Sequence, residues 1–132
     1  MKRSGLINRH ILFVLASLGH GDCIAIADCG LPIPKGVRCV DLAIVMGVPS
    51  FQEVVRAVAE ELIIQRIVIS QEMRIFNSKQ YDFIKSLFRD IPVEEIPHVS
   101  FKEKLKDVKA VIRTGEATPY SNVIFESGVA FR

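Results

Sequence analysis

The residues Cys23-Ile24-Ala25-Ile26-Ala27 form a short, uninterrupted apolar run that ends at Asp28. A strand that is covered on both faces of a sheet has this pattern, because neither face alternates with polar side chains. The run therefore predicts a buried strand of an α/β domain. A carboxylate directly after it would stand at the carboxyl-terminal edge of the sheet, where open α/β sheets bind their ligands.

The segments around this run alternate between helical and strand-like patterns. Asn8 is a suitable N-cap for a helix that continues to Leu18 and stops at a left-handed Gly19. Further patterns predict helices at residues 51–64, 78–89 and 101–107, the last capped by Ser100, and strands at 37–45, 66–70, 93–97, 110–114 and 122–125. This alternation indicates an α/β fold with a largely parallel sheet flanked by helices. We find no linker or internal repeat, so residues 1–132 are expected to form a single domain.

The composition is that of a folded soluble domain. Of the 132 residues, 49% are hydrophobic and 24% are charged, and the net charge is +2. This balance does not indicate a nucleic-acid partner, and no apolar run approaches the ~20 residues that a helix needs to cross a membrane. The three cysteines, Cys23, Cys29 and Cys39, lack CxxC spacing. An odd number of isolated thiols favours a reducing, cytoplasmic location.

Several common chemistries lack their sequence motifs. The chain contains no phosphate-binding loop, no dinucleotide-binding glycine turn and no nucleophile elbow. The histidines His10, His20 and His98 lie far apart in the sequence. No ligand spacing typical of a metal site is present, although folding could still bring two of them together. We therefore expect neither a metal ion nor an organic cofactor.

His20 is the first candidate for chemistry, because it lies between Gly19 and Gly21 in the loop after the first predicted helix. The flanking glycines leave the imidazole accessible and let backbone amides approach a ligand. A histidine can also donate and accept a proton near neutral pH. The alternative is a loop histidine that caps the preceding helix, and the residues alone favour neither interpretation.

Asp28 and His98 are the next candidates, because each follows a predicted strand. Asp28 either binds a ligand at the edge of the sheet or caps the rigid loop at residues 30–34. His98 comes directly after the predicted strand at 93–97, and without further information it is an ordinary loop histidine.

The segment at residues 113–122 is the most polar part of the chain. Tyr120 and Asn122 lie two apart, so in an extended chain their side chains point to one face and could bind the hydroxyl groups of a ligand. The alternatives are an interface aromatic and a turn residue. Arg113 and Glu116 are expected to form a structural ion pair.

Three of these segments resemble the ribose pyranase and fucose mutarotase family. They are Leu-Gly-His-Gly-Asp at residues 18–22, Ile-Ala-Asp-Cys-Gly-Leu-Pro-Ile-Pro at 26–34 and Ile-Arg-Thr-Gly-Glu-Ala-Thr-Pro-Tyr-Ser-Asn at 112–122. Residues 5–8 and 127–131 are similar to the family as well, so the likeness runs through the whole chain. The first segment is shared with the fucose branch, whereas the other two are similar to the ribose branch.

The resemblance implies a sugar-ring isomerase that interconverts the pyranose and furanose forms of D-ribose by opening and reclosing the hemiacetal. A fucose-type mutarotase and a non-catalytic sugar-binding module are the alternatives. Residue by residue, the resemblance implies a proton donor, His20, and a group that binds the sugar: Asp28, His98, Tyr120, Ser121 and Asn122. It also implies a homo-oligomer, a ring-shaped decamer, with no metal or organic cofactor.

The positions of His20 and Asp28 add a geometrical expectation. They flank one predicted strand, and their eight-residue separation spans up to roughly 26 Å of extended chain. A ribose cannot bridge that distance. We therefore expect a site that contains both residues to be shared between neighbouring chains, which would make oligomerisation a condition of activity.

Overall fold

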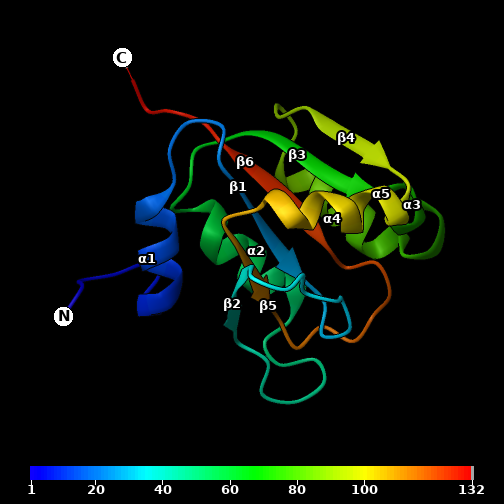
Figure 1. Ribbon diagram of the computed structural model, residues 1–132, viewed down its shortest axis with the longest axis horizontal. Helices are drawn as coiled ribbons and strands as arrows, with labels where there is room; N and C mark the ends of the chain where they lie inside the picture. The colour runs from blue at the N-terminus through cyan, green and yellow to red at the C-terminus, as the bar shows by residue number, and fades with distance from the viewer. Residues whose placement is uncertain (132) are drawn as a thin grey trace.

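A six-stranded sheet lies at the centre of the computed structural model, which describes residues 1–131. The strands are β1 (Cys23–Ala27), β2 (Arg38–Asp41), β3 (Ile64–Ser70), β4 (Val93–Ile96), β5 (Ala110–Arg113) and β6 (Val123–Ser127). They lie in the order β2-β5-β1-β6-β3-β4 (Figure 1). β6 is antiparallel to both of its neighbours, whereas the other pairings are parallel. The predicted α/β fold with a largely parallel sheet is confirmed.

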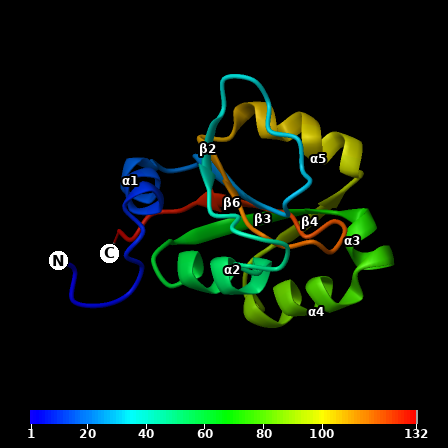
Figure 2. The same ribbon diagram turned by 90° about the horizontal axis from the view of Figure 1, so that it is seen from below.

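Helices cover both faces of this sheet. They are α1 (Arg9–Ser17), α2 (Phe51–Ala59), α3 (Gln71–Phe76), α4 (Ser78–Leu87), α5 (His98–Lys104) and the 3-10 helix η1 (Leu105–Asp107). Figure 2 shows α5 on one side of the sheet and α2 and α4 on the other. One hydrophobic core therefore lies beneath α1 to α4, and a second lies beneath α5 and η1.

The apolar run of β1 is uninterrupted because the strand lies between these two cores. Neighbouring residues of a strand point to opposite faces. Ile24 and Ile26 accordingly pack in the core beneath α1 to α4, while Ala25 and Ala27 pack beneath α5. All four side chains are fully buried. The sequence prediction for this strand, including its two ends, is confirmed.

The end of the first helix differs from the prediction. The Asn8 side chain caps α1 as expected, but Leu18 leaves the helix in an extended conformation, with φ −76° and ψ 129°. Gly19 does not take the left-handed conformation; Gly21 does, with φ 84°. The reason is a tight turn in which Asp22 accepts the Gly19 N–H with its carboxylate and donates its own N–H to the Gly19 carbonyl, at 2.8 and 3.1 Å.

The predictions for the middle of the chain were also partly wrong. The helix predicted at residues 51–64 ends at Ala59, because the chain turns at Glu60 and Glu61 and β3 already begins at Ile64. Helix α3 was not predicted; the Ser70 hydroxyl caps it by accepting the Met73 N–H.

Ser100 does not cap the helix predicted at residues 101–107. Helix α5 begins three residues earlier than predicted, at His98. The cause is a contact from elsewhere in the fold, because the carboxylate of Glu72 in α3 accepts the His98 backbone N–H. A helix start that depends on a side chain distant in sequence cannot be read from the local pattern.

Candidate active site

The carboxyl-terminal end of β1 meets the residue that precedes β6, and this places Asp28 against Asn122. The Asp28 backbone N–H donates to Asn122 Oδ1 at 2.8 Å, and Asn122 Nδ2 donates to Asp28 Oδ2 at 3.0 Å. The Gly30 N–H donates to the other carboxylate oxygen of Asp28. Burial raises the pKa of Asp28, and these hydrogen bonds oppose the rise because they favour the charged carboxylate. Asn122 is only 2% exposed, so it fixes the carboxylate from the inside of the fold.

Tyr120 lies beside this pair in an unusual backbone conformation. Its φ of 59° is left-handed, a region that side chains other than glycine rarely adopt. Its ring stacks on Phe76 at a centroid distance of 5.8 Å and meets the edge of His98 at 5.0 Å. The aromatic contacts on both sides hold the phenol ring in the space next to His98.

Asn77 and Ser121 hold the loop that carries Tyr120. The Asn77 side-chain amide donates to the Pro119 carbonyl at 2.7 Å and to the hydroxyls of Thr118 and Ser121 at 3.1 and 3.2 Å. Ser121 is fully buried, and its hydroxyl also bonds to the Thr118 hydroxyl at 2.8 Å. The network explains how the strained backbone at Tyr120 is kept in place.

His98 is the first residue of α5 and lies between the rings of Tyr120 and Phe101. Its own ring stacks on that of Phe101. Its Nδ1 atom is buried and has no hydrogen-bond partner among residues 1–131. Burial lowers the pKa of His98, and nearby Lys102 lowers it further. A neutral imidazole with an unpaired buried nitrogen is suited to form a hydrogen bond with a ligand.

A hollow of about 340 Å³ opens next to the Asp28 carboxylate. Its walls come from the loop after β1 and from the loop before β6, with Met46 of the β2–α2 loop on one side. Its volume lies within the range of small-molecule sites. The structure therefore brings together five of the predicted site residues at this edge of the sheet, and the first of them also lines the hollow: Asp28, His98, Tyr120, Ser121 and Asn122.

His20 lies elsewhere, at the amino-terminal end of β1. The whole of β1 separates it from Asp28, and it does not line the hollow beside that residue. The His20 side chain is exposed, and its Nε2 atom lies 2.9 Å from Oε1 of Gln65, near the start of β3. A single chain therefore does not bring His20 to the other five residues.

Arg113 and Glu116 do not form the predicted ion pair. Arg113 instead pairs with Asp41 at 3.0 Å and donates to the Cys29 carbonyl. Glu116 accepts the Phe51 N–H at the start of α2. Both side chains hold loops near the site, and they are separated because each finds a partner in a different part of the chain.

The residues that sequence reasoning missed are Glu72 and Asn77, which position His98 and the Tyr120 loop. Glu72 lies in α3 and Asn77 directly follows this helix, which the sequence analysis did not predict. Neither has a local signal of its role, because both act on segments far away in the sequence.

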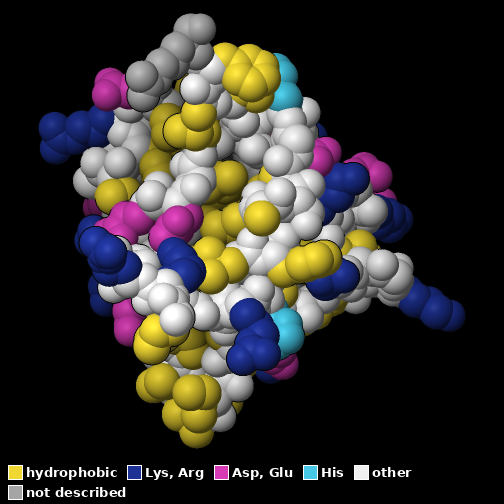
Figure 3. All heavy atoms as spheres, turned by 90° about the vertical axis from the view of Figure 1, so that its left-hand side faces the viewer, with side chains coloured by type: hydrophobic (Ala, Val, Ile, Leu, Met, Phe, Trp, Pro, Cys, Tyr) yellow, Lys and Arg dark blue, Asp and Glu magenta, His cyan; other side chains and the backbone are white. Residues whose placement is uncertain are grey.

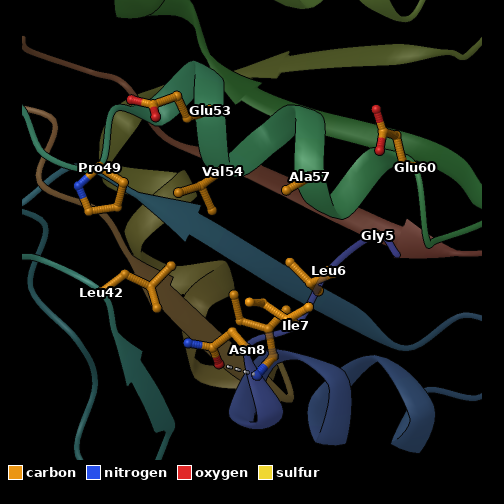
Figure 4. Close-up of a pocket in the computed structure, with 11 residues that line it drawn as sticks. Gly5, Leu6, Ile7, Asn8, Leu42, Pro49, Glu53, Val54, Ala57 and Glu60 are labelled. Atoms are coloured by element: carbon orange, nitrogen blue, oxygen red, sulfur yellow. Dashed lines mark hydrogen bonds between the residues drawn. The ribbon is translucent and has the colours of Figure 1, made fainter. Parts of the chain in front are cut away.

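A second hollow, of about 450 Å³, lies between the amino-terminal segment and α2 (Figure 4). Its lining is mostly apolar, with Leu6, Ile7 and Val54 among the residues that face it. The carboxylate of Glu53, at its rim, is occupied in the capping box of α2. The hollow contains none of the predicted site residues.

Two further observations concern the described residues 1–131. No group of three or more histidine, cysteine, aspartate or glutamate side chains is arranged to hold a metal ion there. None of the helices in the same part of the chain combines the length and the apolar character needed to span a membrane.

Known proteins resemble this chain over its whole length. Residues 1–130 match the RbsD / FucU transport protein family. A D-ribose pyranase of Geobacillus thermodenitrificans is 50% identical over 131 residues, which cover 99% of both chains. The structure of Bacillus subtilis RbsD complexed with D-ribose is similar with a TM-score of 0.97 and 44% identity, over 99% of this chain and 100% of that one.

A fucose mutarotase from Streptococcus pneumoniae, solved in complex with L-fucose, shares the fold at a greater distance. Its TM-score is 0.79 at 19% identity, over 95% of each chain. At this identity the likeness concerns the fold alone. The ribose-binding structure and the D-ribose pyranase are thus much more similar to the chain than this fucose-binding protein.

Proposed function

The chain belongs to the RbsD / FucU transport protein family, and on this premise we propose that it acts as a D-ribose pyranase, an enzyme that interconverts the pyranose and furanose rings of D-ribose. A relative of that activity at 50% identity over the full length supports the proposal. The observation that carries it is the meeting of Asp28, His98, Tyr120 and Asn122 at one edge of the sheet, where Asp28 also lines a hollow. Carboxylate, imidazole, phenol and amide groups together can donate and accept the hydrogen bonds that a polyhydroxylated sugar requires.

The reaction needs only proton transfers and one exchange of C–O bonds. The ring oxygen of the pyranose gains a proton as its bond to the anomeric carbon breaks. The anomeric hydroxyl loses its proton and becomes the carbonyl of the open chain. The 4-hydroxyl then attacks that carbonyl and loses its own proton, while the carbonyl oxygen gains one, and the furanose is formed.

His20 donates the proton to the ring oxygen in this proposal. A histidine can give a proton and take it back near neutral pH, so one side chain serves ring opening and reclosure. The sugar-binding residues hold the hydroxyls, because their orientation decides which of them attacks the open-chain aldehyde. Ser121, with its hydroxyl engaged by Asn77 and Thr118, contributes by fixing the Tyr120 loop against the sugar.

The separation of His20 from Asp28 leads us to propose a site shared by two copies of the chain, in a homo-oligomer that we take to be a decamer. An exposed apolar tip supports assembly. Ile44, Val45 and Met46 in the β2–α2 loop are 77%, 62% and 84% exposed. Figure 3 shows apolar side chains gathered at the lower end of the molecule, where Figure 1 places this loop. Met46 also lines the hollow beside Asp28, so a copy that covers the tip would lie next to the sugar.

We further propose that the protein works in the cytoplasm. The thiols of Cys23, Cys29 and Cys39 are free. Free thiols are typical of proteins that stay in a reducing compartment. Fractionation of the source cells, followed by detection of the protein in each fraction, tests this location.

Ring exchange of ribose, followed by NMR saturation transfer between the pyranose and furanose signals, tests the function. The wild-type protein should accelerate the exchange, and His20→Ala should remove about 10²–10⁴-fold of that acceleration. A fucose-type mutarotase would instead accelerate only the exchange between fucose anomers. A non-catalytic sugar-binding module would bind ribose with no acceleration in either protein. Either result would refute the pyranase proposal.

A further inference from the structure

A chain of side-chain hydrogen bonds leads from His20 into the sheet. His20 Nε2 lies 2.9 Å from Gln65 Oε1, and Gln65 Nε2 donates to Glu126 Oε2 at the same distance. Arg66 Nη2 donates to the other carboxylate oxygen of Glu126, Oε1, at 3.2 Å. Arg66 also pairs with Glu94. The four linked side chains therefore come from the loop before β1 and from two neighbouring strands, β3 and β6.

The donor and the acceptor in every bond of this hydrogen-bond chain follow from the pair at its far end, Arg66 and Glu126. The guanidinium group can only donate, and an ionised carboxylate can only accept. The hydrogen bond from Gln65 and the charge of Arg66 lower the pKa of Glu126, which keeps it ionised. Gln65 must therefore turn its amide nitrogen towards Glu126 and its carbonyl oxygen towards His20. A carbonyl oxygen can only accept, so the His20 atom that faces it must carry a hydrogen.

We propose that Glu126, acting through Gln65, sets the tautomer of His20, so that Nε2 always carries a hydrogen and Nδ1 is the atom that exchanges protons with the sugar. This inference rests on the proposed function for the role of Nδ1. Gln65 and Glu126 are positioning residues, since neither is placed against the sugar. The assignment of Nε2 concerns the free protein and is independent of any substrate.

The arrangement suits a side chain that both gives and takes a proton. Neutral His20 would offer a lone pair at Nδ1, and protonated His20 would offer an N–H there. In both states Nε2 keeps its hydrogen and its bond to Gln65, so the hydrogen-bond chain does not have to rearrange during turnover. The imidazole would thus stay oriented through ring opening and reclosure.

The backbone of the His20 loop is fixed to the same part of the sheet. The Gly21 N–H donates to the Ser127 carbonyl, and the Ser127 N–H donates to the Asp22 carbonyl, both at 2.8 Å. Ser127 directly follows Glu126 in β6. Ser127 therefore holds the backbone of the His20 loop, and its neighbour Glu126 holds the His20 side chain through Gln65. Together these contacts define the direction of the imidazole as well as its tautomer.

Glu126→Gln gives a sharp test, because it should invert the tautomer. Arg66 would keep an oxygen of the new amide, so its NH₂ group would face Gln65. Gln65 would then turn its carbonyl towards residue 126 and its own NH₂ towards His20. Nε2 would become an acceptor, and the hydrogen would move to Nδ1. Glu94→Gln is the matched control, because Glu94 also pairs with Arg66 but has no hydrogen bond to Gln65.

The measurement is ¹⁵N NMR of the imidazole nitrogens at about pH 8.5, where an ordinary histidine is neutral. We expect the Nε2–H form in the wild type and in Glu94→Gln, and the Nδ1–H form in Glu126→Gln. A wild-type spectrum of the Nδ1–H form overturns the proposal. A Glu126→Gln spectrum identical to the wild type overturns it as well.

Kinetics of ribose ring exchange test the role of Nδ1. At metal sites, loss of the partner that orients a histidine costs about 10- to 100-fold in activity, and we take the same scale for His20. We expect a fall of that size in kcat, with KM unchanged, for Glu126→Gln and for Gln65→Leu, and no change for Glu94→Gln. An unchanged kcat in the two positioning variants overturns the role of Nδ1. If the wild type itself accelerates no exchange, the proposed function fails, while the tautomer is still decided by the spectrum of the free protein.

Discussion

The two ends of β1 hold their functional side chains in different ways. At the carboxyl-terminal end, Asp28 is half-buried and bonded to Asn122, which is itself almost fully buried. At the amino-terminal end, His20 is exposed and contacts the rest of the fold through one side-chain hydrogen bond, to Gln65. The first end is part of the structure that keeps the chain folded, whereas the second is attached to its surface.

This difference indicates that the two ends of β1 have separate functions. The groups that we propose to bind the sugar are preorganised within one chain, because the contacts that orient them also stabilise the fold. The proposed proton donor, His20, is accessible from outside, as it must be if it serves the hollow of a second copy. Changes at the first end should therefore affect binding and stability together, and changes at the second should affect only catalysis.

The largest expected effect is the contrast between catalysis and binding for His20→Ala. In this variant kcat should fall by about 10²–10⁴-fold while the Kd for ribose stays near the wild-type value, because orientation of the hydroxyls comes from the other end of β1. Asn122→Ala should weaken ribose binding instead. Isothermal titration with ribose, beside the exchange measurement, gives both quantities. Equal losses of binding in the two variants would remove the distinction between the ends.

Mixing His20→Ala with Asn122→Ala, each impaired at one end of β1, tests whether one site uses both ends. If His20 serves the hollow of a neighbouring copy, some sites in a mixed oligomer contain an intact His20 from one chain and an intact Asn122 from the other. Random assembly of equal amounts would give about a quarter of the wild-type sites. Partial unfolding or dissociation, followed by joint reassembly, should therefore restore exchange activity. Each variant reassembled alone is the control, and a mixture that stays inactive contradicts the shared site.

Variants at the two ends of β1 should also differ in their free energy of unfolding, but by less than they differ in catalysis. Asn122→Leu leaves the Asp28 N–H and carboxylate without their partner, and a buried polar group that loses its partner costs about 1–3 kcal/mol. His20→Ala removes only surface contacts, so its free energy of unfolding should stay within about 0.5 kcal/mol of the wild type. Urea denaturation of both variants measures the difference. A loss for His20→Ala as large as that for Asn122→Leu would show that the amino-terminal end is part of the structural core.

The sequence predicts the carboxyl-terminal end better than it predicts the network around it. Residues 23–27 are apolar at every position because both faces of β1 are buried, and this pattern is local. Asp28 could be placed at the sheet edge for the same reason. Asn77, Glu72 and Gln65 could not be assigned a role, because each acts on a residue at least 26 positions away. Such contacts depend on how the helices and strands pack, which local periodicity does not encode.

The smallest expected effect concerns His98, whose pKa is lowered by burial. In the unfolded chain this imidazole takes up a proton near pH 6.5, whereas in the folded protein it does so only at a lower pH. Between these two pKa values the unfolded state binds more protons, so His98 stabilises the fold above about pH 6.5 and loses this contribution as the pH falls. His98→Gln should therefore weaken the dependence of the free energy of unfolding on pH between about 5 and 7. An identical pH dependence in wild type and His98→Gln would mean that burial at the carboxyl-terminal end does not reach the imidazole, and that His98 is as accessible as His20.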